Sequence, residues 1–342
     1  MTLRDRLHRP LGALRISVTD RCNLRCRYCM PAAAYRWLPD ASLLDYGELL
    51  RLAEVFVALG VTKVRITGGE PLLRPNLEHL VAGLAAIDGV RDLALTTNGT
   101  RLAASAEALR GAGLARVTIS LDTLRPERMR MLSRHDRSDD VIAGIDSACR
   151  VGFDAIKLNT VVMRGSNDDE LVDIVRFARA RGLEPRFIEY MDVGGALEWR
   201  PDEVVPGPEI VARLAEAFGG ATAIPRTSDP HAPAERWRLG DGMVIGVVAS
   251  TTAPFCRDCD RSRLTADGRW YRCLYAEEGI DLASPLRQGA GDAALRTIVR
   301  EGWLARSDRG AELRSALPER GALVPLTRLR DDPGLEMHVR GG

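Results

Sequence analysis

The fold of this chain is decided by one stretch near its start, Leu14-Arg15-Ile16-Ser17-Val18-Thr19, which leads directly into Asp20-Arg21-Cys22-Asn23-Leu24-Arg25-Cys26-Arg27-Tyr28-Cys29. In the first part, polar residues recur at every second position, which predicts a strand with one polar face. The second part places three cysteines, Cys22, Cys26 and Cys29, in the loop after that strand. We call these three the N-terminal cysteine set.

The combination of a strand and a following helix recurs along the chain. The predicted strands are residues 14–19, 62–67, 93–97, 116–121, 155–162 and 186–191, and the predicted helices are residues 46–59, 77–87, 104–111, 140–151, 168–181 and 207–218. Successive βα units imply parallel strands that are joined by right-handed crossovers. An open doubly wound sheet and a barrel, complete or partial, both fit this order.

Polar side chains near the carboxyl ends of the strands favour the barrel. Buried parallel strands are normally continuous apolar runs, whereas Lys63 and Arg65 share one strand face, as do Lys157 and Asn159. Such faces suggest a common polar interior that opens at the carboxyl rim. Salt bridges that fill a barrel core are the alternative. We therefore predict an α/β fold, a partial (β/α)6 TIM-like barrel over residues 1–218, with a C-terminal extension over residues 219–342.

The extension contains a second set of three cysteines, Cys256, Cys259 and Cys273, here called the C-terminal cysteine set. Short β-like runs at residues 236–239, 243–248, 262–265 and 269–273 surround it, and the last two flank the hairpin signal Ala266-Asp267-Gly268. A helix is predicted around residues 292–301. The two sets take six of the seven cysteines, and Cys149 is interpreted as a core thiol.

Neither set has a nearby histidine to complete a tetrahedral site, since the nearest in sequence are His8 and His231. Structural zinc takes four protein ligands, whereas a cubane iron–sulfur cluster on three thiolates leaves one iron open to a small molecule. Iron–sulfur clusters are therefore the favoured interpretation. Zinc with a distant fourth ligand and a disulfide are the alternatives for the N-terminal set.

Bulk composition excludes several classes of function. The 342 residues are 45% apolar and 28% charged, and 48 cationic against 47 acidic side chains leave a net charge of only +1. We therefore expect no nucleic-acid or anionic-membrane partner. No apolar run approaches the length of a spanning helix, and the N-terminus lacks the apolar stretch of a signal peptide. Reduced cysteines with metal-type spacing predict a cytoplasmic location.

The N-terminal set resembles the signature of the radical S-adenosylmethionine (SAM) enzymes, in the string Arg21 to Met30. In that family, three cysteines hold a [4Fe-4S] cluster whose open iron is chelated by SAM, and an electron from the cluster cleaves SAM to a 5′-deoxyadenosyl radical. The segment Thr67-Gly68-Gly69-Glu70-Pro71 resembles the glycine-rich motif of the family. The resemblance implies that Tyr28, Gly69, Ser120 and Met191 bind SAM, although Ser120 also fits a strand end and Met191 also fits core packing.

The C-terminal cysteine set indicates one particular family among the radical SAM enzymes. Cys256-Arg257-Asp258-Cys259-Asp260-Arg261-Ser262-Arg263-Leu264, together with Cys273, is similar to the GTP 3′,8-cyclase family of molybdenum cofactor biosynthesis. Asp260 stands where asparagine is expected in many relatives. The resemblance implies a second [4Fe-4S] cluster, which receives the guanine base. The extension would thus carry an auxiliary iron–sulfur cluster.

The activity implied by this resemblance is the conversion of GTP to (8S)-3′,8-cyclo-7,8-dihydroguanosine 5′-triphosphate, by removal of the C3′ hydrogen and attack on C8. It is the first step of molybdenum cofactor biosynthesis. The residues expected to bind GTP are Arg15, Arg65, Thr96, Lys157, Arg261, Ser262 and Arg263, and those expected in catalysis are Arg15, Arg261 and Arg263. Lys63 is a further candidate phosphate partner. The terminal Gly341-Gly342 pair, ordinarily a frayed end, is expected to enter the active site.

The resemblance also implies partners. The product would pass to cyclic pyranopterin monophosphate synthase, a flavodoxin- or ferredoxin-type electron donor would reduce the cluster, and a homodimer is common in the family. Two other functions compete with this interpretation. One is a radical SAM peptide maturase with an auxiliary-cluster domain, and the other is a non-catalytic metal-binding module that senses redox state or binds nucleic acid.

Overall fold

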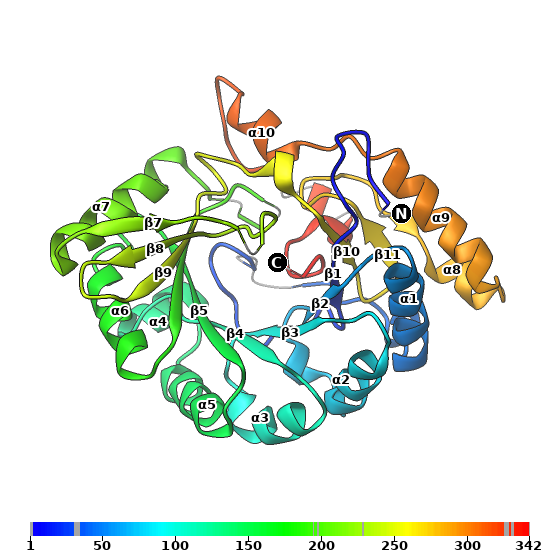
Figure 1. Ribbon diagram of the computed structural model, residues 1–342, viewed down its shortest axis with the longest axis horizontal. Helices are drawn as coiled ribbons and strands as arrows, with labels where there is room; N and C mark the ends of the chain where they lie inside the picture. The colour runs from blue at the N-terminus through cyan, green and yellow to red at the C-terminus, as the bar shows by residue number, and fades with distance from the viewer. Residues whose placement is uncertain are drawn as a thin grey trace.

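The structure is a computed structural model that describes residues 3–30, 35–193, 195–196, 198–227, 229–324, 328–329 and 332–341. Its strands form one sheet in the order β12-β11-β10-β1-β2-β3-β4-β5-β6-β9-β8-β7. The sheet curves into an open ring with helices outside it (Figure 1). The predicted partial barrel is confirmed, because the sheet of the described strands ends at β12 and β7 instead of closing on itself.

Six parallel strands form the central part of this ring. They are β1 (Ala13–Ser17), β2 (Lys63–Thr67), β3 (Asp92–Thr97), β4 (Arg116–Ser120), β5 (Ala155–Val162) and β6 (Glu184–Glu189). Alternate residues such as Ile16, Ile66 and Ile119 are fully buried beneath the helices. The intervening polar residues therefore point into the ring, because side chains alternate across a strand.

The helices of the βα units cover the outer face (Figure 1). They are α1 (Tyr46–Ala58), α2 (Leu77–Ala86), α3 (Leu102–Gly111), α4 (Pro126–Ser133), α5 (Ser138–Val151), α6 (Leu171–Ala180) and α7 (Gly207–Phe218). The start of α1 is fixed by a capping box, in which the Asp45 carboxylate accepts from Glu48 N and the Glu48 carboxylate accepts from Asp45 N, both at 2.8 Å. Helix α4 was not predicted.

The residues after 219 extend the ring at both edges. Strand β9 (Val244–Val248) pairs in parallel with β6, and β8 (Glu235–Leu239) and β7 (Ala221–Ile224) follow it in antiparallel order. At the other edge, β10 (Arg261–Leu264) is parallel to β1, and β11 (Arg269–Tyr271) and β12 (Ile280–Asp281) complete the sheet. The hairpin around residues 266–268 is confirmed, whereas the division into residues 1–218 and 219–342 stays a prediction.

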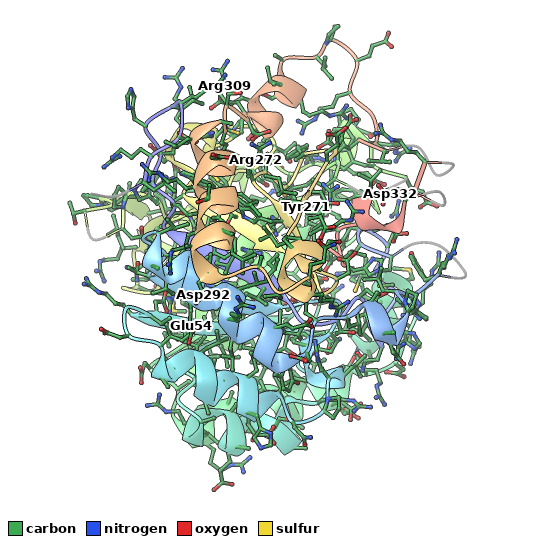
Figure 2. The ribbon with its side chains drawn as sticks, turned by 90° about the vertical axis from the view of Figure 1, so that its right-hand side faces the viewer. Glu54, Tyr271, Arg272, Asp292, Arg309 and Asp332 are labelled. Carbon is green, nitrogen blue, oxygen red and sulfur yellow. The ribbon has the colours of Figure 1, made fainter. Side chains whose placement is uncertain are left out.

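The extension also contains the helices α8 (Ala283–Arg287), α9 (Asp292–Leu304) and α10 (Gly310–Ser315). Figure 2 shows α9 against α1, with Asp292 at the start of α9, where its carboxylate lies 2.8 Å from Arg51 Nε. Beneath this contact, the Trp270 ring lies 5.4 Å from the Phe56 ring and 6.4 Å from the Trp303 ring. These aromatic contacts join α1, β11 and α9 in one core.

Short 3₁₀ helices complete the described elements: η1 (Asp40–Ser42), η2 (Pro71–Leu73), η3 (Pro201–Glu203), η4 (Cys256–Asp258) and η5 (Pro333–Leu335). Strand β11 ends at Tyr271, two residues earlier than predicted, so Cys273 lies in the turn after the strand. Among the described helices, none is long and apolar enough to cross a bilayer.

Candidate active site

The two cysteine sets line one cavity inside the ring. The N-terminal set follows the carboxyl end of β1, whereas Cys256 and Cys259 precede the amino end of β10. These two strands are parallel and in register, with Ala13 opposite Arg261. The N-terminal set and the Cys256–Cys259 pair therefore lie toward opposite ends of the same cavity.

The loop of the N-terminal set is held by its backbone. Arg25 N and Arg27 N donate to the carbonyls of Ser133 and Leu132 at the end of α4, at 2.9 and 2.8 Å. Burial raises the pKa of the Cys22 thiol to about 11, and it also raises the pKa values of Cys26 and Cys29. Thiols that ionise so reluctantly need a metal cation to become thiolates.

A single metal ion makes different demands on a site from a four-iron cluster. Among the described residues, no three His, Cys, Asp or Glu side chains are arranged to hold one ion. A four-iron cluster does not require its thiolates to converge on one point, because each thiolate binds a different iron. Three soft thiolate donors on one loop fit that cofactor.

Glycines let the turn after β2 approach the cysteine loop. Gly69 N donates to Thr19 O at 2.7 Å, and a Cβ atom at Gly69 would lie 2.3 Å from Arg21 O. The following Glu70 is fully buried and accepts hydrogen bonds from Leu72 N, Thr97 Oγ1 and Asn98 N, at 3.0, 2.7 and 2.7 Å. Burial raises the pKa of Glu70 to about 7 despite these donors. Glu70 therefore ties the ends of β2 and β3 together.

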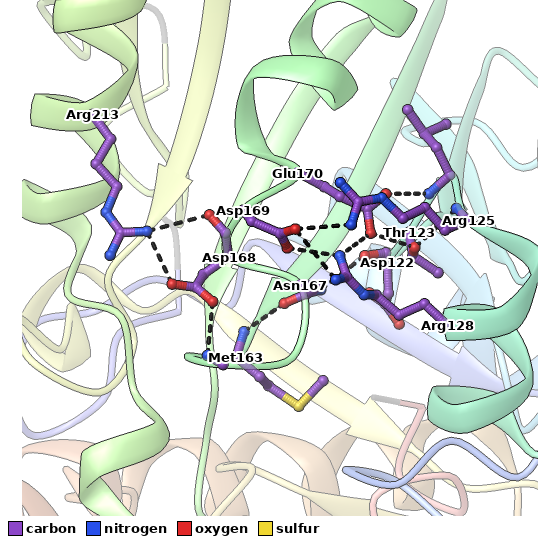
Figure 3. Close-up of polar contacts among 12 residues, drawn as sticks. Asp122, Thr123, Arg125, Arg128, Met163, Asn167, Asp168, Asp169, Glu170 and Arg213 are labelled. Atoms are coloured by element: carbon purple, nitrogen blue, oxygen red, sulfur yellow. Dashed lines mark hydrogen bonds and ion pairs between the residues drawn. The ribbon is translucent and has the colours of Figure 1, made fainter.

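A second polar network fixes the ends of β4 and β5, and Figure 3 shows its residues Asp122 and Asn167. Asp122 accepts hydrogen bonds from Val161 N at 2.9 Å and from the Tyr28 hydroxyl at 2.8 Å. Asn167 Nδ2 donates to the carbonyls of Asp122 and Val161, both at 2.8 Å. Burial raises the pKa of Asp122 to about 6. The network thereby orients Tyr28 beside the cysteine loop.

Glu170 extends the network in Figure 3 to the start of α4. Its buried carboxylate accepts hydrogen bonds from Thr123 Oγ1 at 2.6 Å and from Leu124 N at 2.7 Å, and it pairs with Arg128. Arg128 also lies 2.7 Å from Asp169. The loop between β4 and α4, next to Ser120, is held in place by these contacts.

Cys259 of the C-terminal set lies between two guanidinium groups. Arg261 Nη2 donates to Cys259 Sγ at 3.7 Å and Arg306 Nη2 donates to it at 3.5 Å. Burial opposes ionisation, yet these two cations lower the pKa of the Cys259 thiol to about 6. This cysteine is therefore prepared as a thiolate ligand.

The wall between the two cysteine sets is strongly cationic. Burial and the neighbouring Arg186 lower the pKa of Lys157 to about 7, and burial with Arg116 lowers that of Arg65 to about 10. Burial and Arg261 lower the pKa of Arg263 to about 9. A lowered pKa of a cation reports unfavourable burial and repulsion between like charges. A bound polyanion would relieve both.

Comparisons with known proteins place the chain in a family. Residues 16–178 match the radical SAM superfamily model, and residues 183–312 match the Molybdenum Cofactor Synthesis C model. The chain is 51% identical, over 99% of its length and 95% of the relative's, to GTP 3′,8-cyclase 1 of Mycobacterium tuberculosis. It belongs to the GTP 3′,8-cyclase family. Identity is 50% to the enzyme of Acidothermus cellulolyticus (92% and 89% covered) and 42% to that of Aquifex aeolicus (91% and 95% covered).

Solved structures confirm the fold of this GTP 3′,8-cyclase family member. Streptococcus suis SuiB matches with a TM-score of 0.62 over 91% of this chain and 69% of that chain, at 15% identity. Its complex with S-adenosylmethionine matches with a TM-score of 0.59 at the same identity, over 90% of this chain and 68% of that one. At this level of identity the likeness shows the fold alone.

Most of the predicted site residues of this cyclase meet in the cavity. Its lining includes Arg15, Tyr28, Arg65, Gly69, Thr96, Ser120, Lys157, Met191, Arg261 and Arg263. Ser262 does not join them, because it is fully buried on the opposite face of β10, where its hydroxyl donates to Ala13 O at 3.5 Å. The predicted contact between Ser262 and GTP stays a prediction.

Sequence reasoning missed a ring of charges at the amino ends of the strands. Arg116 forms an ion pair with Asp92, and Arg186 Nε lies 2.9 Å from Glu184. Lys157 Nζ lies 3.8 Å from the same Glu184 carboxylate. The salt-bridge alternative is therefore realised at this end of the barrel. The sequence signal that could have revealed these charges is spacing along the strand. Arg116 lies four residues before Ser120, and Arg186 lies two residues before Ile188. Residues separated by an even number share a strand face, and Ser120 and Ile188 line the cavity.

The C-terminal tail enters the ring (Figure 1). The Gly341 carbonyl accepts from Arg15 Nη1 at 3.2 Å and from Arg263 Nη1 at 2.8 Å. Gly341 has φ +67, and a Cβ atom there would lie 2.4 Å from the Thr67 methyl group. Only glycine combines this conformation with this approach. Gly342 lies outside the described residues.

Proposed function

We propose that this chain is a radical SAM cyclase that converts GTP to (8S)-3′,8-cyclo-7,8-dihydroguanosine 5′-triphosphate, the first step of molybdenum cofactor biosynthesis. The observation that carries the proposal is that both cysteine sets line one cavity, with a cationic wall between them. Membership of the GTP 3′,8-cyclase family supports the same substrate and reaction.

The N-terminal end of the cavity is the proposed SAM site. Cys22, Cys26 and Cys29 would hold a [4Fe-4S] cluster, which with SAM supplies a 5′-deoxyadenosyl radical when bound. Four cavity-lining residues, Tyr28, Gly69, Ser120 and Met191, are proposed to bind SAM. The hydrogen bond from the Tyr28 hydroxyl to Asp122 keeps the Tyr28 side chain in one orientation. The networks of Figure 3 hold the strand ends around this side chain in place.

The other end of the cavity is the proposed guanine site. Cys256, Cys259 and Cys273 would hold a second [4Fe-4S] cluster that binds the base. Arg15, Arg261 and Arg263 line the cavity beside this set and are proposed as the catalytic residues. Their guanidinium groups present planar pairs of donors that suit base edges and phosphates. Arg15 and Arg263 already converge on the Gly341 carbonyl, which supports an active-site role for the tail.

The triphosphate is proposed to bind the cationic wall. Arg65 donates to Thr96 Oγ1 at 3.2 Å and to Thr118 Oγ1 at 3.0 Å, which holds its guanidinium in the cavity. Lys157 also lines this cavity, and its pKa is lowered. Lys63 is paired at 2.8 Å with Asp229, so its proposed phosphate contact requires that ion pair to open. Binding of several negative charges would then stabilise this wall.

The proposed partners follow from the reaction. A flavodoxin- or ferredoxin-type protein would supply the electron, and cyclic pyranopterin monophosphate synthase would take the product. A homodimer and a cytoplasmic location are proposed as well, the latter because cluster-binding thiols need a reducing compartment.

The proposal is tested by anaerobic reconstitution with iron and sulfide, followed by SAM and dithionite. We expect 5′-deoxyadenosine to form strongly with GTP and weakly with ATP or without nucleotide, and a product with the mass of GTP to accumulate. SAM cleavage that is indifferent to GTP would contradict the substrate. Absence of cleavage by a protein verified to hold its clusters would contradict the enzyme class.

A further inference from the structure

A buried charge cluster lies next to the C-terminal cysteine set. Arg9, Arg306 and Asp5 are 2%, 1% and 5% exposed. The Asp5 carboxylate lies 2.6 Å from Arg9 Nε and 3.3 Å from Arg306 Nη1. Figure 1 shows the N-terminal segment beside α9, and there Trp303 Nε1 donates to Arg9 O at 3.2 Å. The cluster thus joins the start of the chain to the end of α9.

Both guanidinium groups reach from this cluster to the cysteine loop. Arg9 Nη1 donates to the Cys256 carbonyl at 2.8 Å, and Arg306 Nη1 donates to the Cys259 carbonyl at 2.9 Å. Only Arg306 also contacts a thiol, because its Nη2 lies 3.5 Å from Cys259 Sγ. Arg306 is held over the Trp303 ring, with 4.4 Å from its Cζ to the ring centre. Two arginines therefore hold the loop, and one of them holds a ligand atom.

The charges of the cluster do not balance. Two guanidinium groups share one carboxylate, and the ion pairs found among the described residues give Arg9 and Arg306 no other acidic partner. Within the same residues, Arg9 Nη2 and Arg306 Nε also lack a hydrogen-bond acceptor. An uncompensated buried cation is costly. A four-iron core on three thiolates carries net negative charge and would offset it.

We infer that Arg306 is a positioning residue for the auxiliary cluster: its hydrogen bond to Cys259 Sγ holds this ligand and raises the midpoint potential of the cluster. The inference rests on the proposed second cluster. A cationic donor to a ligand sulfur stabilises the more negative, reduced state, which raises the potential. Arg306 acts through Cys259 and not on the substrate, because it is fully buried and is absent from the described lining of the cavity.

Arg261 contacts the same cysteine as Arg306, but from the side of the cavity. It donates to the same Cys259 sulfur at 3.7 Å, but from the lining of the cavity. Cys259 thus receives one guanidinium from the substrate side and one from the protein interior. Arg306 keeps the sulfur in place independently of the substrate, so that Arg261 and the open iron keep a constant relation to each other.

The test uses the full chain with Cys22, Cys26 and Cys29 replaced by alanine, so that only the auxiliary cluster remains. In this background, Arg306→Gln, Arg306→Lys and Arg9→Gln are compared. Arg9→Gln is a matched control, because it removes a guanidinium from the same Asp5 carboxylate without touching a sulfur. Iron content, thermal stability and a redox titration followed by electron paramagnetic resonance are measured for each protein.

We expect Arg306→Gln to shift the midpoint potential to more negative values at full iron content, Arg306→Lys to shift it less, and Arg9→Gln to lower thermal stability at an unchanged potential. Equal shifts in Arg306→Gln and Arg9→Gln, or no shift in either Arg306 variant that retains iron, would overturn the inference. If Arg306→Gln fails to fold, the Arg306→Lys potential decides. A background protein without about four iron atoms per chain would instead refute the second cluster itself.

Discussion

At the scale of single residues, the cavity brings together groups whose charge depends on what it holds. Lys157, Arg65 and Arg263 all have a lowered pKa, because they are buried and surrounded by other cations. Of these, only Lys157, at about 7, titrates near neutral pH. The GTP binding proposed for this wall would therefore be linked to the charge of Lys157.

We predict that GTP affinity falls as the pH rises through 7 and above. The free protein loses the Lys157 charge around its lowered pKa of about 7, and phosphate binding favours the charged form. The dissociation constant of GTP, measured anaerobically between pH 6 and 8, should rise with pH by about tenfold, as expected for one charged hydrogen bond, and Arg263, with its pKa of about 9, stays largely charged over this range. In Lys157→Arg, whose guanidinium stays charged, that rise should be absent. The same pH dependence in both proteins would contradict the role of Lys157.

A second residue-scale prediction concerns the tail. Gly341→Ala should lower turnover by about 10²-fold, because the new Cβ would meet Thr67 and displace the carbonyl that Arg15 and Arg263 bind. Thermal stability should change little. The matched control is Gly321→Ala, since a Cβ atom at Gly321 meets nothing within 4 Å. Wild-type turnover of Gly341→Ala would refute an active-site role for this residue.

At the scale of elements, buried carboxylates hold the strand ends. Glu189 is fully buried at the end of β6 and accepts hydrogen bonds from Gly207 N, Thr251 N and Thr252 N at 2.7 to 2.8 Å, and from Thr252 Oγ1 at 2.6 Å. Glu70 and Glu170 act in the same way at the ends of β2 and β4. The loops that carry the site are thus attached to rigid strands.

Glu189→Gln should destabilise the protein by about 2 kcal/mol, because the amide nitrogen would face donors that the carboxylate now accepts from. Denaturant unfolding of the purified chain measures this loss. The control is Glu216→Gln on the exposed side of α7, which should change stability by less than about 0.5 kcal/mol. Equal stability of the two variants would show that Glu189 is not a structural tie.

The sequence predicts the βα units well because each is a local pattern, with alternate apolar residues in the strand and helical periodicity after it. It missed α4, in whose sequence PERMRMLS half of the residues are polar, and β7, whose short run ATAI carries little signal. It also missed the ion pairs of Arg116 with Asp92 and of Arg306 with Asp5. Such pairs join residues far apart in sequence, and only the register of the strands and the docking of α9 bring them together.

At the scale of the whole molecule, one sheet presents two cysteine sets to one cavity. The parallel pairing of β1 with β10 separates the N-terminal set from Cys256 and Cys259 along the strand axis. The extension thereby adds a second cysteine set to a radical SAM barrel. Replacing one cysteine set with alanine should therefore remove the cluster proposed for that set and leave the cluster proposed for the other.

We predict that the chain with Cys256, Cys259 and Cys273 replaced by alanine holds about four iron atoms instead of about eight. It should still bind SAM, because the N-terminal set remains intact, but it should no longer cleave SAM in response to GTP. Iron analysis and the 5′-deoxyadenosine yield with and without GTP measure these outcomes. Retained stimulation by GTP would contradict the guanine site proposed at this end.

The most direct test of the central claim is the transfer of deuterium from labelled GTP to 5′-deoxyadenosine. With GTP that carries deuterium at C3′, we predict one deuterium in the 5′-deoxyadenosine formed by the reconstituted enzyme, and none with GTP labelled at C2′. Deuterium from C2′, or unlabelled 5′-deoxyadenosine from both substrates, would contradict the account of this chain as a cyclase that acts at C3′ of GTP.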